Sequence, residues 1–445
     1  MIKNRHLLFW SITVALGGFL FGFDTAVISG AEQTIQTVWQ LSSVQHGLTV
    51  SIALLGTVIG ALFGGIPSDS LGRRQTLFWI AVLYFLSALG SALATDWYLF
   101  LLFRFIGGLG VGASSVAAPM YISEISPANA RGRLVALFQF NVVFGILIAY
   151  LSNYLIGGSR AQDWRWMLGV EAIPALIFLV LILFVPESPR WLVIKKGKLA
   201  DALKVLKIIN PVGAEAELES IQSSAEVERE SSKSPFFSKR YSFPISLAVL
   251  FAMFNQLSGI NAIIYYAPRI FAMTGLDTAS SLLSTAGIGI TNFAATLIAL
   301  NFIDRFGRRK LMLIGSVGLI TTLALVSHAF FTQSFGGLWV PIYLFLYIAF
   351  FAFSQGAVIW VFISEVFPNR VRAQGQALGS FAHWFMAALV AFIFPIITQA
   401  LGGGLTFLLF SGMMILQLLF VVKMMPETNG KSLEEMETSL HYEKV

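Results

Sequence analysis

Residues 69–74 read Asp-Ser-Leu-Gly-Arg-Arg, and residues 304–309 read Asp-Arg-Phe-Gly-Arg-Arg. Two further matches follow in the same order: Ile122-Ser123-Glu124 with Ile363-Ser364-Glu365, and Pro186-Glu187-Ser188 with Pro426-Glu427-Thr428. Every match recurs about 240 residues later, which indicates an internal repeat rather than chance. The chain is therefore predicted to consist of two similar halves that run parallel to each other.

The composition places these halves in a membrane. Of the 445 residues, 56% are hydrophobic and only 12% are charged, and the mean hydropathy is +0.77. Soluble domains have about 25% charged residues, so this chain has too little polar surface to fold in water. Long apolar runs such as 405–422 lack the alternation of a transmembrane strand, which excludes a β-barrel.

Twelve apolar stretches are long enough to cross a bilayer, which takes about 20 residues in a helix. They are residues 8–30, 47–67, 76–94, 97–122, 134–156, 167–185, 243–273, 280–301, 310–332, 338–364, 375–400 and 404–424. We predict an all-α membrane protein with twelve transmembrane helices in two six-helix bundles, residues 1–185 and 243–424.

The polar remainder consists of a central linker and a tail. Residues 186–242 are predicted to form a cytoplasmic linker with short amphipathic helices, because residues 200–209 have helical periodicity and residues 214–233 are rich in Glu and Ser. A disordered linker is the alternative. Residues 425–445 are predicted to be a cytoplasmic tail, with a short helix near 431–437.

The net charge of +6 reflects the distribution of loops rather than a nucleic-acid partner. Most of the 29 Lys and Arg residues fall in loops on one side, whereas the opposite loops hold only Arg160 and Arg165. By the positive-inside rule, both termini and the linker face the cytoplasm. The chain has no cysteine and no Asn-x-Ser/Thr sequon, so disulfides are excluded and a bacterial inner membrane is favoured.

The repeated motifs place charges at the inner helix ends. Their Gly allows a tight turn, and their Arg pair supplies the inner positive charge. We expect a salt-bridge network that holds the two halves in one conformation and breaks in another; the alternative is that the motifs serve only as topology anchors. The candidates for this gating network are Asp69, Arg73, Arg74, Glu124, Arg131, Glu187, Arg190, Asp304, Arg308, Arg309, Glu365, Arg372 and Glu427.

Ionisable residues inside the membrane are costly and usually functional. Asp24 in the first span and Arg104 in the fourth are predicted at similar depths, so they are able to pair. If the pair breaks, a buried Asp24 takes up a proton, which would couple proton movement to a conformational change. The alternative is a permanent structural ion pair. Glu171, near the start of the sixth span, is a weaker candidate that we expect at the interface.

The seventh span contains a cluster of carboxamides. Asn255, Gln256 and Asn261 lie within seven residues, next to a Gly that lets the helix break. Carboxamides offer several donors and acceptors without net charge, which suits a neutral polyol. The predicted substrate site adds Gln139, Asn292 and His383 as polar groups, and Trp360 and Trp384 as rings that stack on a sugar. Each of these residues taken alone is more often a packing contact.

The ordered motifs resemble the sugar porter family of the major facilitator superfamily. They are residues 17–24, Gly-Gly-Phe-Leu-Phe-Gly-Phe-Asp; 104–108, Arg-Phe-Ile-Gly-Gly; 186–191, Pro-Glu-Ser-Pro-Arg-Trp; 256–261, Gln-Leu-Ser-Gly-Ile-Asn; and 426–431, Pro-Glu-Thr-Asn-Gly-Lys. The resemblance implies a sugar site between two bundles and alternating access. It also places Gln139, Gln256, Asn261, Asn292 and Trp360 at sugar-contacting positions, and Asp24 and Arg104 at the proton-coupling pair.

Three positions depart from the family pattern. Asn255 stands where a second Gln is frequent, and His383 stands where Asn or Gln is usual. Residues 356–360 read Gly-Ala-Val-Ile-Trp where Gly-Pro is common, so we expect no hinge there.

These features, a membrane Asp near an Arg and a neutral, amide-rich site, predict a proton symporter that moves a hexose or pentose across the inner membrane. The alternative is a facilitative sugar uniporter without proton coupling, although such transporters usually have Asn at the position of Asp24. A sugar sensor and a drug exporter are further rivals. We expect no catalytic residue, no metal, no cofactor and no nucleic-acid partner, and a monomer in the lipid bilayer.

Overall fold

The computed structural model describes residues 4–127, 130–157, 160–230, 236–368 and 371–430, without the side chains of residues 132, 224–230, 300 and 304. Within these ranges the chain is helical and contains no strand. Eleven segments are long and apolar enough to span a membrane. The last, α18 (Arg372–Lys423), contains two spans, because Gly402 (φ 75°, ψ 168°) interrupts its helical geometry. The predicted twelve-helix fold is therefore confirmed.

The first half of the chain supplies six spans. Its helices are α1 (Arg5–Val38), α2 (Ser43–Phe63), α3 (Gly65–Ser70), α4 (Arg73–Leu93), α5 (Trp97–Ile125), α6 (Arg131–Ile156), α7 (Asp163–Gly169), α8 (Ala172–Leu181) and the short 3-10 turn η1 (Ile182–Phe184). The main difference from the prediction is α1, which extends to Val38 rather than ending near residue 30. In its last turns Glu32 is buried, and Gln33, Thr34 and Gln36 are half-buried, so the helix continues beyond the apolar stretch.

The second half supplies the remaining spans, and several of them are interrupted. Its helices are η2 (Lys239–Tyr241), α12 (Ser242–Leu257), α13 (Ile260–Met273), α14 (Thr278–Phe306), α15 (Arg308–Phe331), α16 (Trp339–Phe351), η3 (Ala352–Gly356), α17 (Ala357–Glu365) and α18. The predicted break in the seventh span is confirmed: Gly259, with φ 84°, separates α12 from α13. A residue with a Cβ would be strained at this φ.

The tenth span has a feature that the sequence analysis did not predict. We expected no hinge without Gly-Pro at residues 356–357, and this expectation stays a prediction, but the span contains a π-helical turn, η3, between α16 and α17. A π-turn interrupts the regular hydrogen bonding of an α-helix without needing proline.

By their internal contacts the residues form two compact units. Unit 1 comprises the described residues within Met1–Thr25, Leu55–Ala149 and Arg165–Lys233, and unit 2 those within Ala26–Leu54, Tyr150–Trp164 and Ser234–Val445. The C-terminal part of α1 and the N-terminal part of α2 thus belong to unit 2 with the C-terminal helices. The reason is visible in the contacts that these parts make with α13 and α18, which are described below.

Unit 1 is built on close helix packing. A Cβ on Gly22 of α1 would collide with the backbone carbonyl of Val142, and one on Gly145 of α6 would collide with that of Phe19. Only glycine lets two helix backbones approach so closely, and such contacts are a common way for helices to associate in membranes. This packing holds the α1 segment that carries Asp24.

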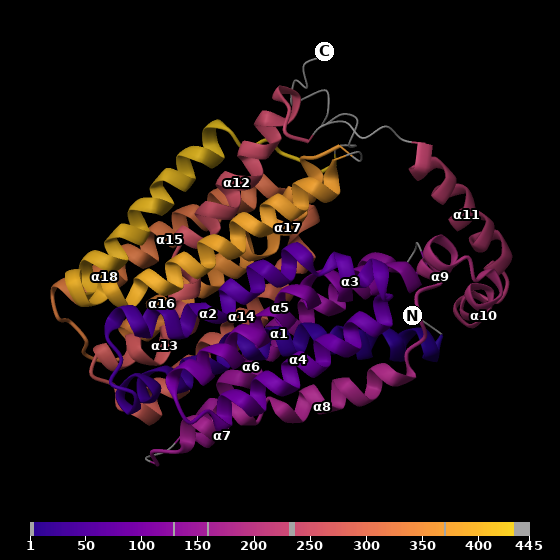
Figure 1. Ribbon diagram of the computed structural model, residues 1–445. Coiled ribbons are helices and arrows are strands. Elements are labelled where there is room, and N and C mark those ends of the chain that lie inside the picture. The colour runs from indigo at the N-terminus through magenta and orange to yellow at the C-terminus, as the bar shows by residue number, and fades with distance from the viewer. Residues whose placement is uncertain (1–3, 128–129, 158–159, 231–235, 369–370, 431–445) are drawn as a thin grey trace. The chain divides into compact units, whose positions relative to one another are not determined.

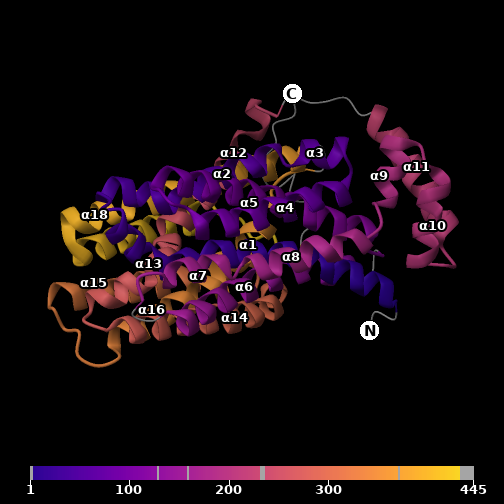
Figure 2. The ribbon, with the colours of Figure 1, turned by 60° about the horizontal axis from the view of Figure 1, so that its bottom comes forward.

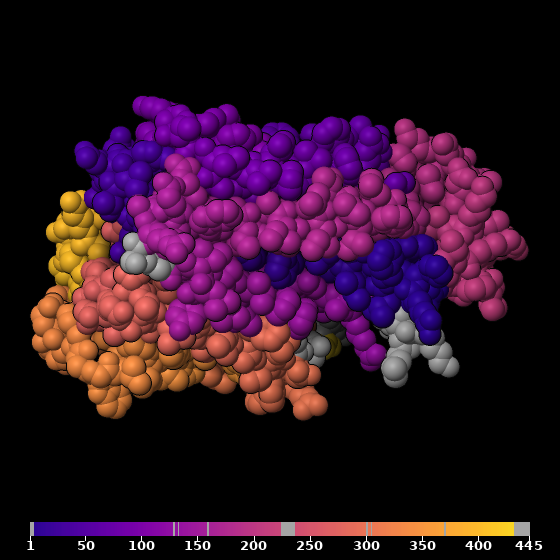
Figure 3. Space-filling view, turned by 90° about the horizontal axis from the view of Figure 1, so that it is seen from below, coloured from indigo at the N-terminus to yellow at the C-terminus, as the bar shows by residue number. Residues whose placement is uncertain are grey.

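The central linker confirms the prediction of short amphipathic helices in unit 1. They are α9 (Pro189–Lys196), α10 (Leu199–Ile209) and α11 (Ala214–Glu230). The α10 helix buries Ala202, Val205, Leu206 and Ile209, which share one face at helical spacing. The three helices lie together in both ribbon views (Figures 1 and 2) and form a continuous magenta surface in the space-filling view (Figure 3). The predicted tail helix near 431–437 lies outside the described residues.

Candidate transport and coupling sites

Asp24 of α1 and Arg104 of α5 form a buried ion pair in unit 1. Nη1 of Arg104 donates to Oδ1 of Asp24 at 2.6 Å, and Nη2 donates to the Asp24 backbone carbonyl oxygen at 3.2 Å. Each residue is 2% exposed. The structure therefore brings the two predicted coupling residues together. Gly107, one turn from Arg104 on α5, packs tightly against Ser87 of α4, since an added Cβ would collide with Ser87 Oγ, whereas its distance of 3.4 Å from Asp24 Oδ1 would be an ordinary contact.

Glu171 lies with this pair, which corrects our interfacial placement of it. The residue is 2% exposed, and its Oε1 has no hydrogen-bond partner among the described residues. It interacts electrostatically with both Asp24 and Arg104. Its position directly before α8, inside an apolar span, brings it into the protein interior. The buried group therefore contains two carboxyls and one guanidinium, and it is neutral only when one carboxyl carries a proton.

Gln256 is the centre of a carboxamide cluster in unit 2. Its Oε1 accepts a hydrogen bond from Asn261 Nδ2 at 2.6 Å, and its Nε2 donates to Asn255 Oδ1 at 2.9 Å. The same Nε2 lies 3.2 Å from Nε2 of His383. The break at Gly259 separates α12, which carries Asn255 and Gln256, from α13, which carries Asn261. Asn255, Gln256, Asn261 and His383 are all buried.

Aromatic rings adjoin this carboxamide cluster. The His383 ring lies 4.9 Å from the Trp360 ring and 4.8 Å from the Trp384 ring, measured between centroids. Both indoles thus lie beside His383, which contacts Gln256. Asn292 lies half-buried on α14 in the same unit, and Gln139 lies half-buried on α6 in unit 1.

Arg73 is the centre of the charged network that the repeated motifs form in unit 1. Its Nε and Nη2 donate to the Glu124 carboxylate at 2.9 Å each, and its Nη1 donates to Asp69 at 3.0 Å. The Glu187 carboxylate accepts from the backbone amides of Arg73, Arg74 and Ser188. It thereby satisfies the first amides of α4, which have no partners within the helix.

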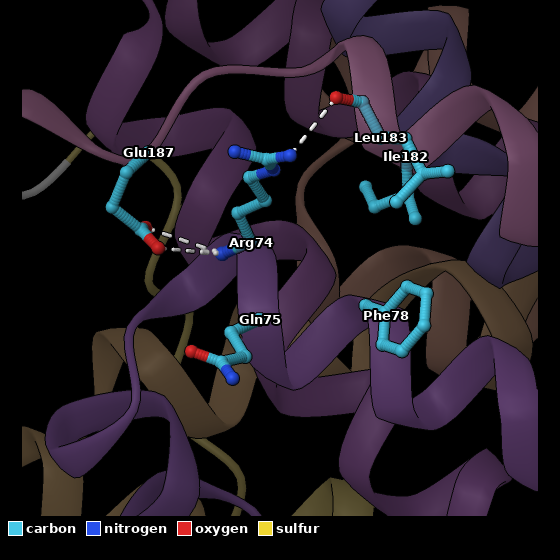
Figure 4. A pocket seen from close by; sticks show the side chains of 6 residues that line it. All are labelled: Arg74, Gln75, Phe78, Ile182, Leu183 and Glu187. Atoms are coloured by element: carbon cyan, nitrogen blue, oxygen red, sulfur yellow. Dashed lines mark hydrogen bonds between the residues drawn. The ribbon is translucent and has the colours of Figure 1, made fainter.

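Glu187 lies outside the spans, and its burial and its hydrogen bonds shift the pKa of its carboxyl in opposite directions. Burial raises the pKa of its carboxyl, while the three backbone amides partly counteract this effect by favouring the charged form. Figure 4 shows Glu187 beside Arg74, whose Nη2 also donates to the Leu183 carbonyl oxygen at 3.0 Å. Together they border a pocket of about 350 Å³ that is lined by Arg74, Gln75, Phe78, Ile182, Leu183 and Glu187.

Unit 2 repeats the network with the corresponding residues. Arg308 donates to Glu365 from Nη2 at 2.9 Å and from Nε at 3.2 Å. Glu427 accepts from the backbone amides of Arg308, Arg309, Thr428 and Asn429. The internal repeat of the sequence is thus a repeat of hydrogen bonding.

The remaining candidates of the gating network have other surroundings. Arg131 donates to backbone carbonyl oxygens of Ser123 and Ser126, and Arg190 lies on α9. Arg372, at the start of α18, has two buried nitrogens without a partner among the described residues. The side chain of Asp304 lies outside the described residues. The ion pairs of Arg73 and Arg308 described above each lie within one unit, so a latch between halves remains a prediction.

The sequence reasoning gave no role to Glu32, His46 and Arg269, which lie together in unit 2. Glu32 and Arg269 are charged residues within or beside apolar spans, and this signal was available for both. It also missed a buried polar chain in which Gln355 of η3 donates to Gln417 at 2.6 Å, and Gln417 donates to Ser316 at 2.8 Å.

Twelve apolar helices around buried charges and carboxamides define a multi-spanning membrane transporter. Residues 10–440 match the family described as "Sugar (and other) transporter". The chain belongs to this family, the sugar porters of the major facilitator superfamily.

Relatives and solved structures agree with this assignment. The D-xylose-proton symporter of Escherichia coli (strain K12) is 36% identical, over 98% of this chain and 96% of that protein. The arabinose-proton symporter of Bacillus subtilis (strain 168) is 37% identical, over 96% and 93%. The inward open structure of the xylose transporter XylE from E. coli superimposes with a TM-score of 0.86 at 35% identity, over 97% of this chain and 99% of that one.

Proposed function

We propose that this protein is a proton-coupled symporter that carries a monosaccharide, a hexose or a pentose, across the bacterial inner membrane. The observation that carries the proposal is the buried ion pair of Asp24 and Arg104. Burying an ion pair inside the membrane costs free energy, because both charges lose their hydration. Ionisable residues at such positions are therefore usually functional. The names of the xylose and arabinose relatives, both proton symporters, support the same function.

Proton coupling follows from the geometry of the pair. While Arg104 bonds Asp24, the carboxylate stays ionised, since the guanidinium supplies the opposite charge. When a conformational change separates them, Asp24 has no counter-ion in a poorly hydrated site and binds a proton instead. Re-forming the pair releases that proton.

Glu171 extends this mechanism with a second carboxyl. Because Arg104 compensates only one negative charge, we assign the proton of the neutral group to Glu171, whose Oε1 lacks a partner among the described residues. Glu171→Gln, which mimics the protonated form, should therefore support transport better than Asp24→Asn.

The carboxamide cluster would bind the sugar. Asn255, Gln256 and Asn261 present amide donors and acceptors that match hydroxyl groups, and they carry no charge. Trp360 and Trp384 would contact the apolar face of the ring. Asn292 of the same unit adds a further proposed contact, and Gln139 is the sugar-contacting residue that we propose in unit 1.

Alternating access would then expose the sugar site to one side at a time. We propose that the halves 1–185 and 243–424 act as two six-helix bundles, and that the inner networks hold one of the two conformations. The excess of Lys and Arg in the inner loops favours cytoplasmic termini and a cytoplasmic linker. A monomer suffices for this mechanism, since one chain supplies both halves.

The test is sugar uptake into proteoliposomes with and without an inward proton gradient. The unmodified protein should accumulate sugar only with the gradient, whereas Asp24→Asn should lose accumulation but keep sugar exchange at equal pH. Asp201→Asn is the matched control, because Asp201 forms an exposed pair with Lys204 on α10. Uptake by the unmodified protein that ignores the gradient would establish a uniporter instead.

A further inference from the structure

A second buried cluster of titratable residues lies in unit 2, apart from Asp24 and Arg104. Nη2 of Arg269 on α13 lies 2.7 Å from Oε2 of Glu32 on α1, and Nε2 of His46 on α2 lies 2.7 Å from the same oxygen. Gln36, one turn after Glu32, accepts from Arg269 Nη2 at 2.6 Å. The cluster thus joins three helices through one carboxylate.

The hydrogen bonds assign the protons of His46. Since the Glu32 carboxylate only accepts, Nε2 of His46 carries the hydrogen that it donates. Nδ1 of His46 is then a free acceptor in the neutral ring, and it has no partner among the described residues although it is buried. With a neutral imidazole, Glu32 and Arg269 balance each other's charge.

A proton on Nδ1 would change this balance. The ring would become a cation whose Nε2 lies 3.3 Å from Nη2 of Arg269, and one carboxylate cannot compensate two cations at this distance. The Glu32 and His46 side chains are fully buried, whereas the Arg269 side chain is 24% exposed. Arg269 is therefore the partner that can leave for water.

No other charge contacts His46 in the described part of the chain. From α13 it meets the Tyr266 ring, 5.8 Å away between centroids, and the hydroxyl of Tyr266 donates to the Ala391 carbonyl oxygen of α18. Beside it, Gly47 of α2 packs against the Phe392 backbone. The described titratable residues of α18, Arg372, His383 and Lys423, lie nine or more residues from Phe392 in the sequence.

We propose that Glu32, His46 and Arg269 form a second proton-binding site, in which a proton taken up by His46 releases Arg269 and separates α13 from α1. The site would lie at the outer end of the spans, so this inference rests on the orientation given under the proposed function. A low pH outside would then favour the state that is open to the outside, where the sugar and the coupling proton enter.

The experiment uses thiol labelling, because the chain has no cysteine of its own. Ser29→Cys places a thiol one turn below Glu32 at a position that is 1% exposed. A membrane-impermeant thiol reagent is added to intact cells between about pH 8 and about pH 6, where histidine titrates. Thr95→Cys, at an exposed position between α4 and α5, corrects for the pH dependence of the reagent.

One proton changes an equilibrium by at most about tenfold per pH unit. We expect the corrected labelling rate of Ser29→Cys to rise at least about threefold toward low pH, within that limit. Adding His46→Gln, which keeps a donor to Glu32 but does not titrate, should abolish the rise. If that variant fails to fold, Arg269→Gln serves instead, since it removes the second cation and should also make labelling independent of pH.

A flat profile for Ser29→Cys, or an unchanged rise in a folded His46→Gln or Arg269→Gln variant, would overturn the proposal. Labelling needs no sugar and no proton gradient, so it is read independently of transport. A protein that fails to accumulate sugar but retains the histidine-dependent rise would contradict the proposed function and leave the second site standing.

Discussion

Arg104 bonds Asp24 twice, once at the carboxylate and once at the backbone carbonyl oxygen, across the interface of α5 and α1. The second bond ties the guanidinium to the backbone of α1, in addition to its bond to the charged carboxylate. Loss of the carboxylate therefore does not by itself remove Arg104 from its place.

Removing Arg104 alone should be much worse for stability than removing both charges. Arg104→Leu leaves a buried carboxylate without a counter-ion, which costs about 3–5 kcal/mol. Asp24→Asn combined with Arg104→Leu should recover a large part of this loss, as measured by thermal unfolding in detergent. Arg160→Leu, at an exposed position, is the control and should stay within about 0.5 kcal/mol. Equal losses in the single and double variants would show that the charges do not interact.

Gln256→Ala should weaken sugar binding by about 1–3 kcal/mol, because Asn255 Oδ1 and Asn261 Nδ2 lose their hydrogen bonds to Gln256 and the substrate loses a donor. Isothermal titration with a panel of sugars measures the effect. Gln75→Ala is the control, because it removes an amide that lines the pocket of unit 1 in Figure 4, and it should leave affinity unchanged. An unaltered affinity in Gln256→Ala would exclude this residue from the site.

The inner networks should be strongly coupled within each half. A double-mutant cycle of Arg73→Ala and Glu124→Ala should give an interaction free energy of about 1.5–3 kcal/mol, since both side chains are 10% exposed and bonded at two points. The exposed pair of Lys204 and Asp201 should give at most about 1 kcal/mol in the same assay. Comparable values for the two pairs would argue that the inner network is only a surface feature.

Glu187 should make stability depend on pH. Because burial raises the pKa of its carboxyl in the folded protein, the folded state binds the proton at a pH where the unfolded chain has already lost it. Relative to Glu187→Gln, the unmodified protein should gain stability as the pH falls from 7 toward 4.5, by at most about 1.4 kcal/mol per pH unit. Melting temperatures of both proteins across this range provide the measurement, and a constant difference would contradict it.

Much of the two candidate sites could be predicted from the sequence, because polar residues are rare in apolar membrane spans and are therefore easily recognised. Asp24, Arg104 and the amides of residues 255–261 are exceptions in apolar helices, so their number and spacing indicated a site. Glu171 was equally visible in the sequence. Whether a residue near a span boundary faces water or the protein interior, however, depends on how the surrounding helices pack against it. The same holds for Glu32 and Arg269, whose partners lie on other helices.

The repeated charged motifs show both what the sequence could predict and what it could not. Their repetition predicted matching networks, and Arg73 and Arg308 indeed hold Glu124 and Glu365 in the same manner. That Glu187 and Glu427 bond backbone amides rather than arginine side chains could not be predicted, because it depends on where the chain returns to a helix start after 114 and 119 residues.

By itself the sequence determined the membrane class, the twelve helices, the repeat and the residue types of the two predicted sites. The reason is that helices in lipid must be apolar, and that polar groups within them are costly and therefore rare. The tertiary structure decided the pairing: which charges meet, that Glu171 joins Asp24, and that His46 and Arg269 share Glu32. Pairing depends on the rotation and depth of each helix, which are set by packing between distant segments and leave no local trace in the sequence.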